Sequence, residues 1–335
     1  MQISDLVFNV AILFVMMLPG VILKRCKMVT DGFGKGLSNL ILYIAQPALI
    51  LYAYLSCKTP FGDIWYNVLA VFIISVAAHL LFSVVTLLLF RGAEDGMRRM
   101  LRFATIFSNA AFMGIPLIQT ILGSEAAIYA SIYNITFNFF LWTLGVWICT
   151  EGKDEDDNGI DDYHDIKMYR KKNVSVVKVL LHPVTLASVI GFLLLVFGVN
   201  IYAYDFWIID DCILSLKNLV APLSMVVIGL RIVDVDFSGI LTDKYMYLSL
   251  ALRHLALPAL VILFIKCLAL LGMNITNEVL LTGTLMAAAP AATSATMFAE
   301  KYGCDAKYVS RLVTVSTLLS IATMPLMVAF SDLLM

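Results

Sequence analysis

The sequence predicts an all-α integral membrane protein of ten transmembrane helices, arranged as two inverted five-helix repeats in which helices 4 and 9 are broken and cross. Three observations support this fold class. Of the 335 residues, 61% are hydrophobic and only 14% are charged, whereas soluble domains carry about 25% charged residues. Long apolar runs alternate with short polar clusters, and every second cluster along the chain is rich in basic residues. Residues that weaken helices recur at related places in the fourth and ninth runs.

The apolar runs are long enough to cross a hydrocarbon core of about 30 Å. Residues 1–10, at the start of the first run, include Asp5 and no basic residue, and no small-residue cleavage site follows that run, so it does not resemble a removable signal peptide. The expected helices lie near residues 5–25, 37–57, 64–90, 100–122, 125–149, 174–199, 206–231, 246–272, 278–301 and 306–332.

The basic residues orient these helices, because lysine and arginine are retained on the cytoplasmic side of a membrane. With the N-terminus outside, the odd-numbered connections and their helix ends hold 20 of the 23 basic residues, Arg231 and Arg253 among them. The opposite side holds only Lys58, Lys217 and Lys266. This sorting predicts a multi-pass protein of the plasma or inner cell membrane with both termini outside.

The chain divides into a first repeat at 1–149, a charged loop at 150–173 and a second repeat at 174–335. The loop is acidic in its first part and basic in its second, and it falls on the cytoplasmic side. We expect a solvated linker there, with a regulatory or partner-binding segment as the alternative. Five helices per half is an odd number, so two related halves must be inverted relative to one another.

Short motifs recur between the halves at a common offset. Leu37-Ser-Asn-Leu opens the second run and Leu216-Lys-Asn-Leu opens the seventh, and a proline follows each. Gly123-Ser-Glu-Ala follows the fourth run and Gly303-Cys-Asp-Ala follows the ninth. Both pairs are about 180 residues apart. Together with the charge pattern, they favour duplication.

The fourth and ninth runs carry the residues that would break a helix. The fourth contains Asn109, Gly114 and Pro116, and the ninth contains Pro290. Proline lacks an amide donor and crowds the carbonyl four residues earlier. We therefore expect breaks within 109–116 and 290–296, with ordinary proline kinks as the alternative.

Broken helices of this kind suit an anion-binding site. Unpaired backbone groups cannot face lipid, so the breaks should line an enclosed cavity. Half-helix N-termini would direct partial positive charge and free amides into it. Asn109, Thr293 and Ser294 can add hydrogen bonds from their side chains.

Other polar residues within the runs are candidates for the same cavity. Asn134 and Asn138 are four residues apart on the fifth helix, and Tyr43 and Gln46 lie on the second. Interhelical hydrogen bonding and packing are the alternatives for these four. The predicted substrate-binding set is Tyr43, Gln46, Asn109, Gly114, Pro116, Asn134, Asn138, Pro290, Thr293 and Ser294.

The stretch from Asn109 to Leu117 resembles the fourth helix of the auxin efflux carrier family, which includes the plant PIN auxin exporters and bacterial organic-acid carriers. Residues 290–302 and Met324-Pro325 look like the family's ninth and tenth helices. The resemblance covers essentially the full chain. It implies that the two broken helices cross near the bilayer centre with a carboxylate bound there. It also implies an elevator in which helices three to five and eight to ten move against one, two, six and seven.

The chain also differs from this family pattern. Plant members have proline where this chain has Ser108, and they carry an acid and a lysine early in the third helix, where this chain has Asp63 and Asn67. Asp63 is by position one candidate for coupling transport to an ion. His79, midway along the third helix, is the other, with a hydrogen-bonded packing role as the alternative.

These features favour a secondary carrier for a small organic anion, most simply an exporter. No GxxxxGK[ST] loop is present for ATP drive, and the runs contain neither paired carboxylates nor HExxH for an intramembrane protease. A sodium-coupled bile-acid-type symporter and a sensor or channel on the same scaffold are the alternatives. We expect no cofactor and no metal site. The expected partners are a small carboxylate-like substrate and the lipid bilayer, with no nucleic acid; a homodimer is left open.

Overall fold

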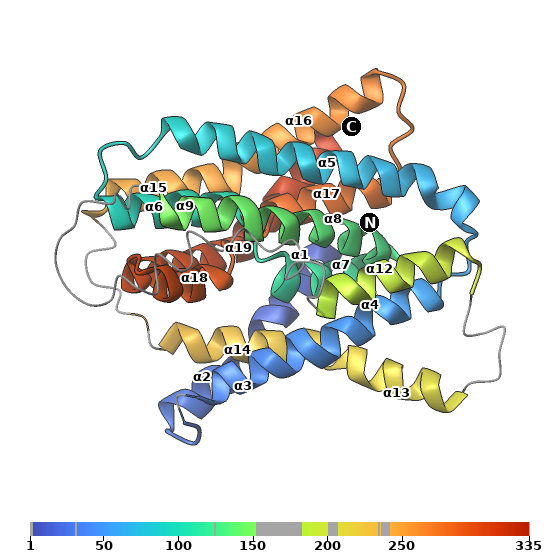
Figure 1. Ribbon diagram of the computed structural model, residues 1–335, viewed down its shortest axis with the longest axis horizontal. Coiled ribbons are helices and arrows are strands. Elements are labelled where there is room, and N and C mark those ends of the chain that lie inside the picture. The colour runs from blue at the N-terminus through green and yellow to red at the C-terminus, as the bar shows by residue number, and fades with distance from the viewer. Residues whose placement is uncertain are drawn as a thin grey trace.

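The fold is taken from a computed structural model (Figure 1), which describes residues 3–30, 32–123, 125–151, 183–199, 207–233, 235 and 242–334. The predicted loop at 150–173 lies outside these residues except for Thr150 and Glu151. Residues 174–182 of the predicted sixth helix also lie outside them.

The described secondary structure is helical apart from one isolated β-bridge. Several helices contain five-residue π-helical segments, labelled η. The elements are α1 (Ile3–Val15), α2 (Leu18–Arg25), α3 (Phe33–Leu40), η1 (Ile41–Ala45), α4 (Gln46–Leu55), α5 (Phe61–Leu88), α6 (Asp95–Ile106), η2 (Ala110–Gly114), α7 (Ile115–Leu122), α8 (Ala126–Phe140), η3 (Leu141–Gly145), α9 (Val146–Thr150), α12 (Pro183–Val196), α13 (Trp207–Asn218), α14 (Val220–Val233), α15 (Lys244–Ala251), η6 (Leu252–Ala256), α16 (Leu257–Leu270), α17 (Asn277–Ala288), α18 (Ser294–Tyr302) and α19 (Ala306–Leu334).

Seven helical stretches among the described residues are long and apolar enough to cross a membrane: Phe8–Arg25, Phe33–Leu55, Phe61–Leu88, Ala126–Thr150, Asp211–Val233, Lys244–Leu270 and Ala306–Leu334. The other three predicted runs correspond to α12 and to two interrupted pairs, α6 with η2–α7 and α17 with α18. The multi-pass helical class is confirmed. Ten crossings and an inverted repeat stay predictions.

The helices pack in two groups. In the first, which we call the scaffold group, α12 and α13 pack on α4, α14 packs on α2 and α3, and α1 packs on α14. In the second, the crossing group, α5 packs on α6 and α8, η2–α7 packs on α8, α17 packs on α16 and α19, and α18 packs on α19. Figure 1 shows α2, α3, α4, α13 and α14 along the lower side and α5, α15, α16 and α17 along the upper side. Contacts of α1 with α19 and of α4 with α8 join the groups.

The outward faces are apolar, as lipid contact requires. On α5 the exposed side chains Leu69, Phe72, Leu80, Val84 and Leu87 follow one another at helical spacing along one stripe. A soluble monomer rarely exposes so large an apolar surface. The opposite face of α5 packs against α8 in the crossing group.

The scaffold group contains one very close helix contact. A Cβ atom on Gly20 of α2 would lie 2.2 Å from the Val226 carbonyl oxygen, and a Cβ on Gly229 of α14 would lie 2.1 Å from the Met17 carbonyl oxygen. Small residues let membrane helices approach backbone to backbone in this way. Each glycine is therefore required by the backbone of the facing helix.

The fourth helix is interrupted at the N-terminal edge of the predicted stretch 109–116. α6 ends at Ile106, Phe107 is extended, and a new helix begins at Ala110 and continues as η2–α7 to Leu122. Pro116 stands in the first turn of α7 and does not break the chain. Its missing amide is tolerated there because the π-helical segment before it already departs from α-helical hydrogen bonding.

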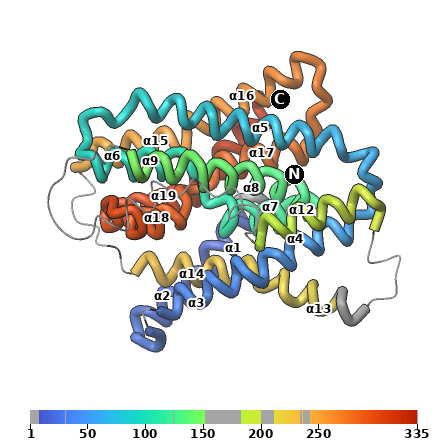
Figure 2. Tube along the Cα trace, in the orientation of Figure 1, coloured from blue at the N-terminus to red at the C-terminus, as the bar shows by residue number. Residues whose placement is uncertain are grey.

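The ninth helix is interrupted at the predicted proline. α17 ends at Ala288, Ala289 turns the chain to φ −57° and ψ 147°, and α18 begins at Ser294. Pro290 lies within this break. Figure 2 shows α7 and α17, one half of each interrupted helix, near the centre of the molecule together with α1 and α8.

Candidate functional site

The two breaks cross and pair with one another. The Asn109 amide donates a hydrogen bond to the Pro290 carbonyl at 2.7 Å, and the Ala292 amide donates to the Phe107 carbonyl at 2.9 Å. Ser108 and Ala291 face each other as an antiparallel β-bridge between these bonds. The backbone groups released by the breaks thus satisfy one another away from lipid.

The second half of each broken helix begins at this crossing. Asn109 is the N-cap of η2–α7 and Thr293 is the N-cap of α18, and neither helix has a side-chain cap. The first amides of a helix lack intrahelical partners, and a helix N-terminus carries about +0.5 of an elementary charge. Two such ends together supply about one positive charge at the crossing.

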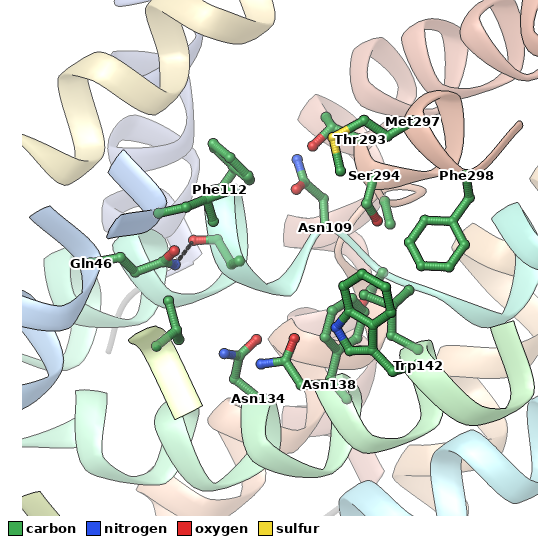
Figure 3. A pocket seen from close by; sticks show the side chains of 17 residues that line it. Gln46, Asn109, Phe112, Asn134, Asn138, Trp142, Thr293, Ser294, Met297 and Phe298 are labelled. Carbon is green, nitrogen blue, oxygen red and sulfur yellow. Dashed lines mark hydrogen bonds between the residues drawn. The ribbon is translucent and has the colours of Figure 1, made fainter. Parts of the chain in front are cut away.

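A cavity of about 90 Å³ lies against these two N-termini. Figure 3 shows Asn134 and Asn138 directed into it from α8, Gln46 entering from α4, and Asn109 lying between Gln46 and the α18 residues. Its lining combines amides and hydroxyls with aromatic and aliphatic side chains: Leu42, Gln46, Ser108, Asn109, Ala111, Phe112, Asn134, Phe137, Asn138, Leu141, Trp142, Val184, Ala292, Thr293, Ser294, Met297 and Phe298.

Four buried polar atoms of this lining have no hydrogen-bond partner among the described residues. They are Asn109 Nδ2, Ser294 Oγ, Gln46 Oε1 and Asn134 Oδ1. A buried polar group without a partner costs about 1–3 kcal/mol. Their gathering around one cavity indicates a place where a polar ligand supplies the missing hydrogen bonds.

Several of the polar or aromatic lining residues lie next to or within π-helical segments. Gln46 follows η1, and its Nε2 donates to the Ala111 carbonyl at 2.6 Å, which ties α4 to η2. Trp142 lies within η3 and reaches the cavity from the same helix that supplies Asn134 and Asn138. π-helical segments of this kind are frequent at functional sites.

One basic side chain lies next to the cavity. Among the described residues that line the cavity, none is acidic or basic, but Arg231 of α14 donates from Nη1 to the Thr293 carbonyl at 2.9 Å. Arg231 was predicted to lie in a cytoplasmic connection, whereas its guanidinium lies next to Thr293, the N-cap of α18. With the two helix N-termini, this arrangement suits an anion.

The structure brings together Gln46, Asn109, Asn134, Asn138, Thr293 and Ser294 of the predicted set and leaves the others outside the lining. Tyr43 is 58% exposed. A Cβ on Gly114 would lie 2.6 Å from Met286 Sδ, so this glycine serves contact with α17. Pro116 is buried in α7, and Pro290 contributes through its carbonyl in the crossing.

The coupling candidates on α5 do not line the cavity. His79 Nδ1 donates to the Ser75 carbonyl at 2.7 Å, and its ring stacks on Phe140 with centroids 5.1 Å apart. This geometry fits the packing interpretation of His79. Asp63 is exposed in the first turn of α5. A coupling role for either residue stays a prediction.

The aromatic side of the cavity was not predicted from the sequence. Phe112, Phe137, Trp142 and Phe298 lie in apolar runs where nothing distinguishes them from lipid-facing side chains. Ser108 was noted only as a departure from the family pattern, yet it lies at the bridge between the breaks. Among the described residues, no cluster of three or more His, Cys, Asp or Glu side chains could hold a metal ion.

Comparison with known families agrees with this architecture. A family model described as a membrane transport protein matches residues 5–328, from α1 into α19. The chain belongs to this family, the auxin efflux carriers. No curated protein sequence matches it. The match spans both broken helices and the whole cavity lining, so the cavity lies within the part shared with the auxin efflux carriers.

One prediction tests whether the unpaired atoms serve a ligand. Asn134→Leu removes a buried acceptor that has no described partner, so we expect it to raise the free energy of unfolding by about 1 kcal/mol or more and to abolish stabilisation by any bound substrate. Thr284→Val is the matched control, because the Thr284 hydroxyl is also buried without a described partner but lies outside the cavity. It should stabilise the protein and leave ligand binding intact, as measured by thermal unfolding in detergent. Equal ligand responses in both variants would contradict the assignment.

Proposed function

We propose that this auxin efflux carrier family member is a secondary active carrier that moves a small monovalent organic anion, a carboxylate, by alternating access in the direction of efflux. The observation that carries the proposal is the cavity, where two helix N-termini and four buried unpaired polar atoms meet. Two N-termini offer about one positive charge, which matches one carboxylate.

The unpaired atoms also suggest the rest of the substrate. Asn109 Nδ2 can donate and Ser294 Oγ can donate or accept, which suits a carboxylate at this end of the cavity. Gln46 Oε1 and Asn134 Oδ1 are acceptors, so a hydroxyl or N–H group on the substrate would pair with them. The volume of about 90 Å³ suits a compound of a few heavy atoms, with Trp142 and Phe298 covering its apolar part.

The position of the cavity supports alternating access. Leu42, Gln46 and Val184 come from the scaffold group, and the other lining residues come from the crossing group. A site at the boundary of two packed groups can open to either side when one group moves against the other, as an elevator would.

The direction follows from the charge. An inside-negative potential of about 100 mV favours exit of a monovalent anion by about 2.3 kcal/mol. Export therefore needs no coupled ion, whereas uptake would need one. We propose the cell membrane as the location, with the termini outside and the 150–173 loop in the cytoplasm, as the basic residues predict.

The experiment is a thermal-unfolding screen of the purified protein against small mono- and dicarboxylates at two pH values, with and without sodium, followed by flux in liposomes. A bound substrate stabilises the folded state in proportion to its occupancy. We expect a carboxylate hit and saturable flux stimulated by substrate on the opposite side. Non-saturable flux would indicate a channel, and sodium-dependent uptake a symporter; either result would contradict the proposal.

A further inference from the structure

Arg253 is buried at the crossing, on the side opposite the N-termini. It was predicted to lie at a cytoplasmic helix end, but it lies within η6 and is 1% exposed. It is the largest of the fully buried side chains among the described residues. Its guanidinium carbon lies 5.3 Å from the centroid of the Phe82 ring. No carboxylate forms a salt bridge with it in the described part of the chain.

The charge of Arg253 is met by backbone carbonyls instead. Nη1 donates to the carbonyls of Thr105 and Ile106, at 3.1 and 3.2 Å, which end α6. Nη2 donates to Ala287 and Ala289, at 2.7 and 2.9 Å, and Nε donates to Ala289 at 3.0 Å, at the end of α17. These bonds use all five guanidinium donors.

The positive charge of Arg253 is balanced by the partial negative charges of two helix C-termini. Each helix C-terminus carries about −0.5 of an elementary charge, so the ends of α6 and α17 together offer about −1 to the single positive charge of Arg253. In carriers with broken helices, such C-terminal ends and unwound carbonyls coordinate a co-transported sodium ion or proton. Here a side chain of the protein fills that place.

From these contacts we infer that Arg253 takes the place of a coupling cation at the crossing, because its guanidinium occupies the carbonyl cluster that such a cation would need. The same bonds hold the two broken helices in register. Transport is therefore independent of sodium. The inference rests on the proposed carrier function for its transport consequence. Arg253 is a positioning residue, since it lies outside the cavity lining and acts through the two broken helices, whose second halves present their N-termini to the anion.

The test restores the missing cation from solution. Arg253→Ala leaves a space shaped for guanidinium, so we expect millimolar guanidinium chloride to raise its thermal unfolding midpoint, whereas potassium chloride at equal ionic strength does not. The wild-type protein should show no such rise. The control is Lys266→Ala, because Lys266 also donates to a backbone carbonyl, that of Leu334 at 2.7 Å, at a distance from the crossing. Absence of guanidinium-specific stabilisation in Arg253→Ala would overturn the inference.

Two further variants separate charge from bulk. Arg253→Met removes the charge and keeps an extended side chain, and Arg253→Lys keeps the charge with fewer donors. We expect flux to fall about 100-fold in the methionine variant, because an unpaired carbonyl cluster is left buried, and to remain measurable in the lysine variant. If Arg253→Ala cannot be purified, the thermal unfolding midpoints of Arg253→Met and Arg253→Lys are compared instead. Equal midpoints in these two variants would overturn the inference.

The sodium dependence of flux is the third test of the inference. Wild-type flux should be the same in sodium and potassium buffers, and a flux that rises with sodium would overturn the inference. The guanidinium titration needs neither substrate nor transport. A failure of the proposed carrier function would therefore show as absent carboxylate binding and flux in the wild type, and would leave the titration as an independent result.

Discussion

Asn109→Ala is expected to reduce carboxylate flux by about 10- to 100-fold while the protein remains folded. A hydrogen bond to a charged ligand contributes about 1.5–3 kcal/mol, and Asn109 Nδ2 has no partner among the described residues that could replace one. The backbone amide of Asn109, which bonds to Pro290, is retained in the variant. The loss should therefore fall on substrate binding, measured as flux in liposomes and as ligand-induced stabilisation.

Asn67→Ala is the matched control for this substitution. Asn67 lies on α5, donates from Nδ2 to the Tyr129 hydroxyl at 3.2 Å and does not line the cavity. We expect it to cost some stability and to leave the flux per folded molecule unchanged. Wild-type flux in Asn109→Ala would rule out the proposed site.

Gly229→Ala is expected to destabilise the protein by at least about 3 kcal/mol, at the upper end of the overpacking range. The new Cβ would lie 2.1 Å from the Met17 carbonyl oxygen and 3.0 Å from its carbon. These are backbone atoms of the facing helix, so no side chain can rotate away. α2 and α14 must separate, which should lower the thermal unfolding midpoint in detergent.

Gly36→Ala provides the comparison for that substitution. Gly36 lies within α3, and a Cβ there would meet nothing within 4 Å. Alanine should be neutral or stabilise the helix by about 0.5–1 kcal/mol. If Gly36→Ala and Gly229→Ala unfold at the same temperature, the close contact of α2 with α14 is contradicted.

The sequence was a good guide to where helices lie, because the length of an apolar run is a local property. Every described helix falls on one of the predicted runs or at its edge. It was a poorer guide to where a helix breaks. The fourth helix was expected to break within 109–116, and the interruption lies at Phe107–Asn109, at the N-terminal edge of that stretch and away from Pro116. What stops α6 there is the pairing of its end with the ninth helix and with Arg253, which no local pattern contains.

The residues at the crossing also fall into those that the sequence predicted and one that it placed wrongly. Asn109, Asn134 and Ser294 stood out because a polar side chain in an apolar run needs a hydrogen-bonding partner, and membrane burial makes that need visible in sequence. Arg253 also lies in such a run, but from the distribution of basic residues along the chain it was predicted to lie at a helix end. A count of basic residues cannot tell an arginine that faces the cytoplasm from one that faces carbonyls.

The sequence by itself determined that this protein is a multi-pass helical membrane protein with weak points in its fourth and ninth runs, because hydrophobic length and proline chemistry act within one helix. Only the tertiary structure decided that the two breaks pair, that their N-termini share one cavity, and that Arg253 closes their C-terminal ends. Those features depend on backbone groups from segments about 180 residues apart, and backbone groups are the same in every residue. Their meeting is therefore invisible until the chain is folded.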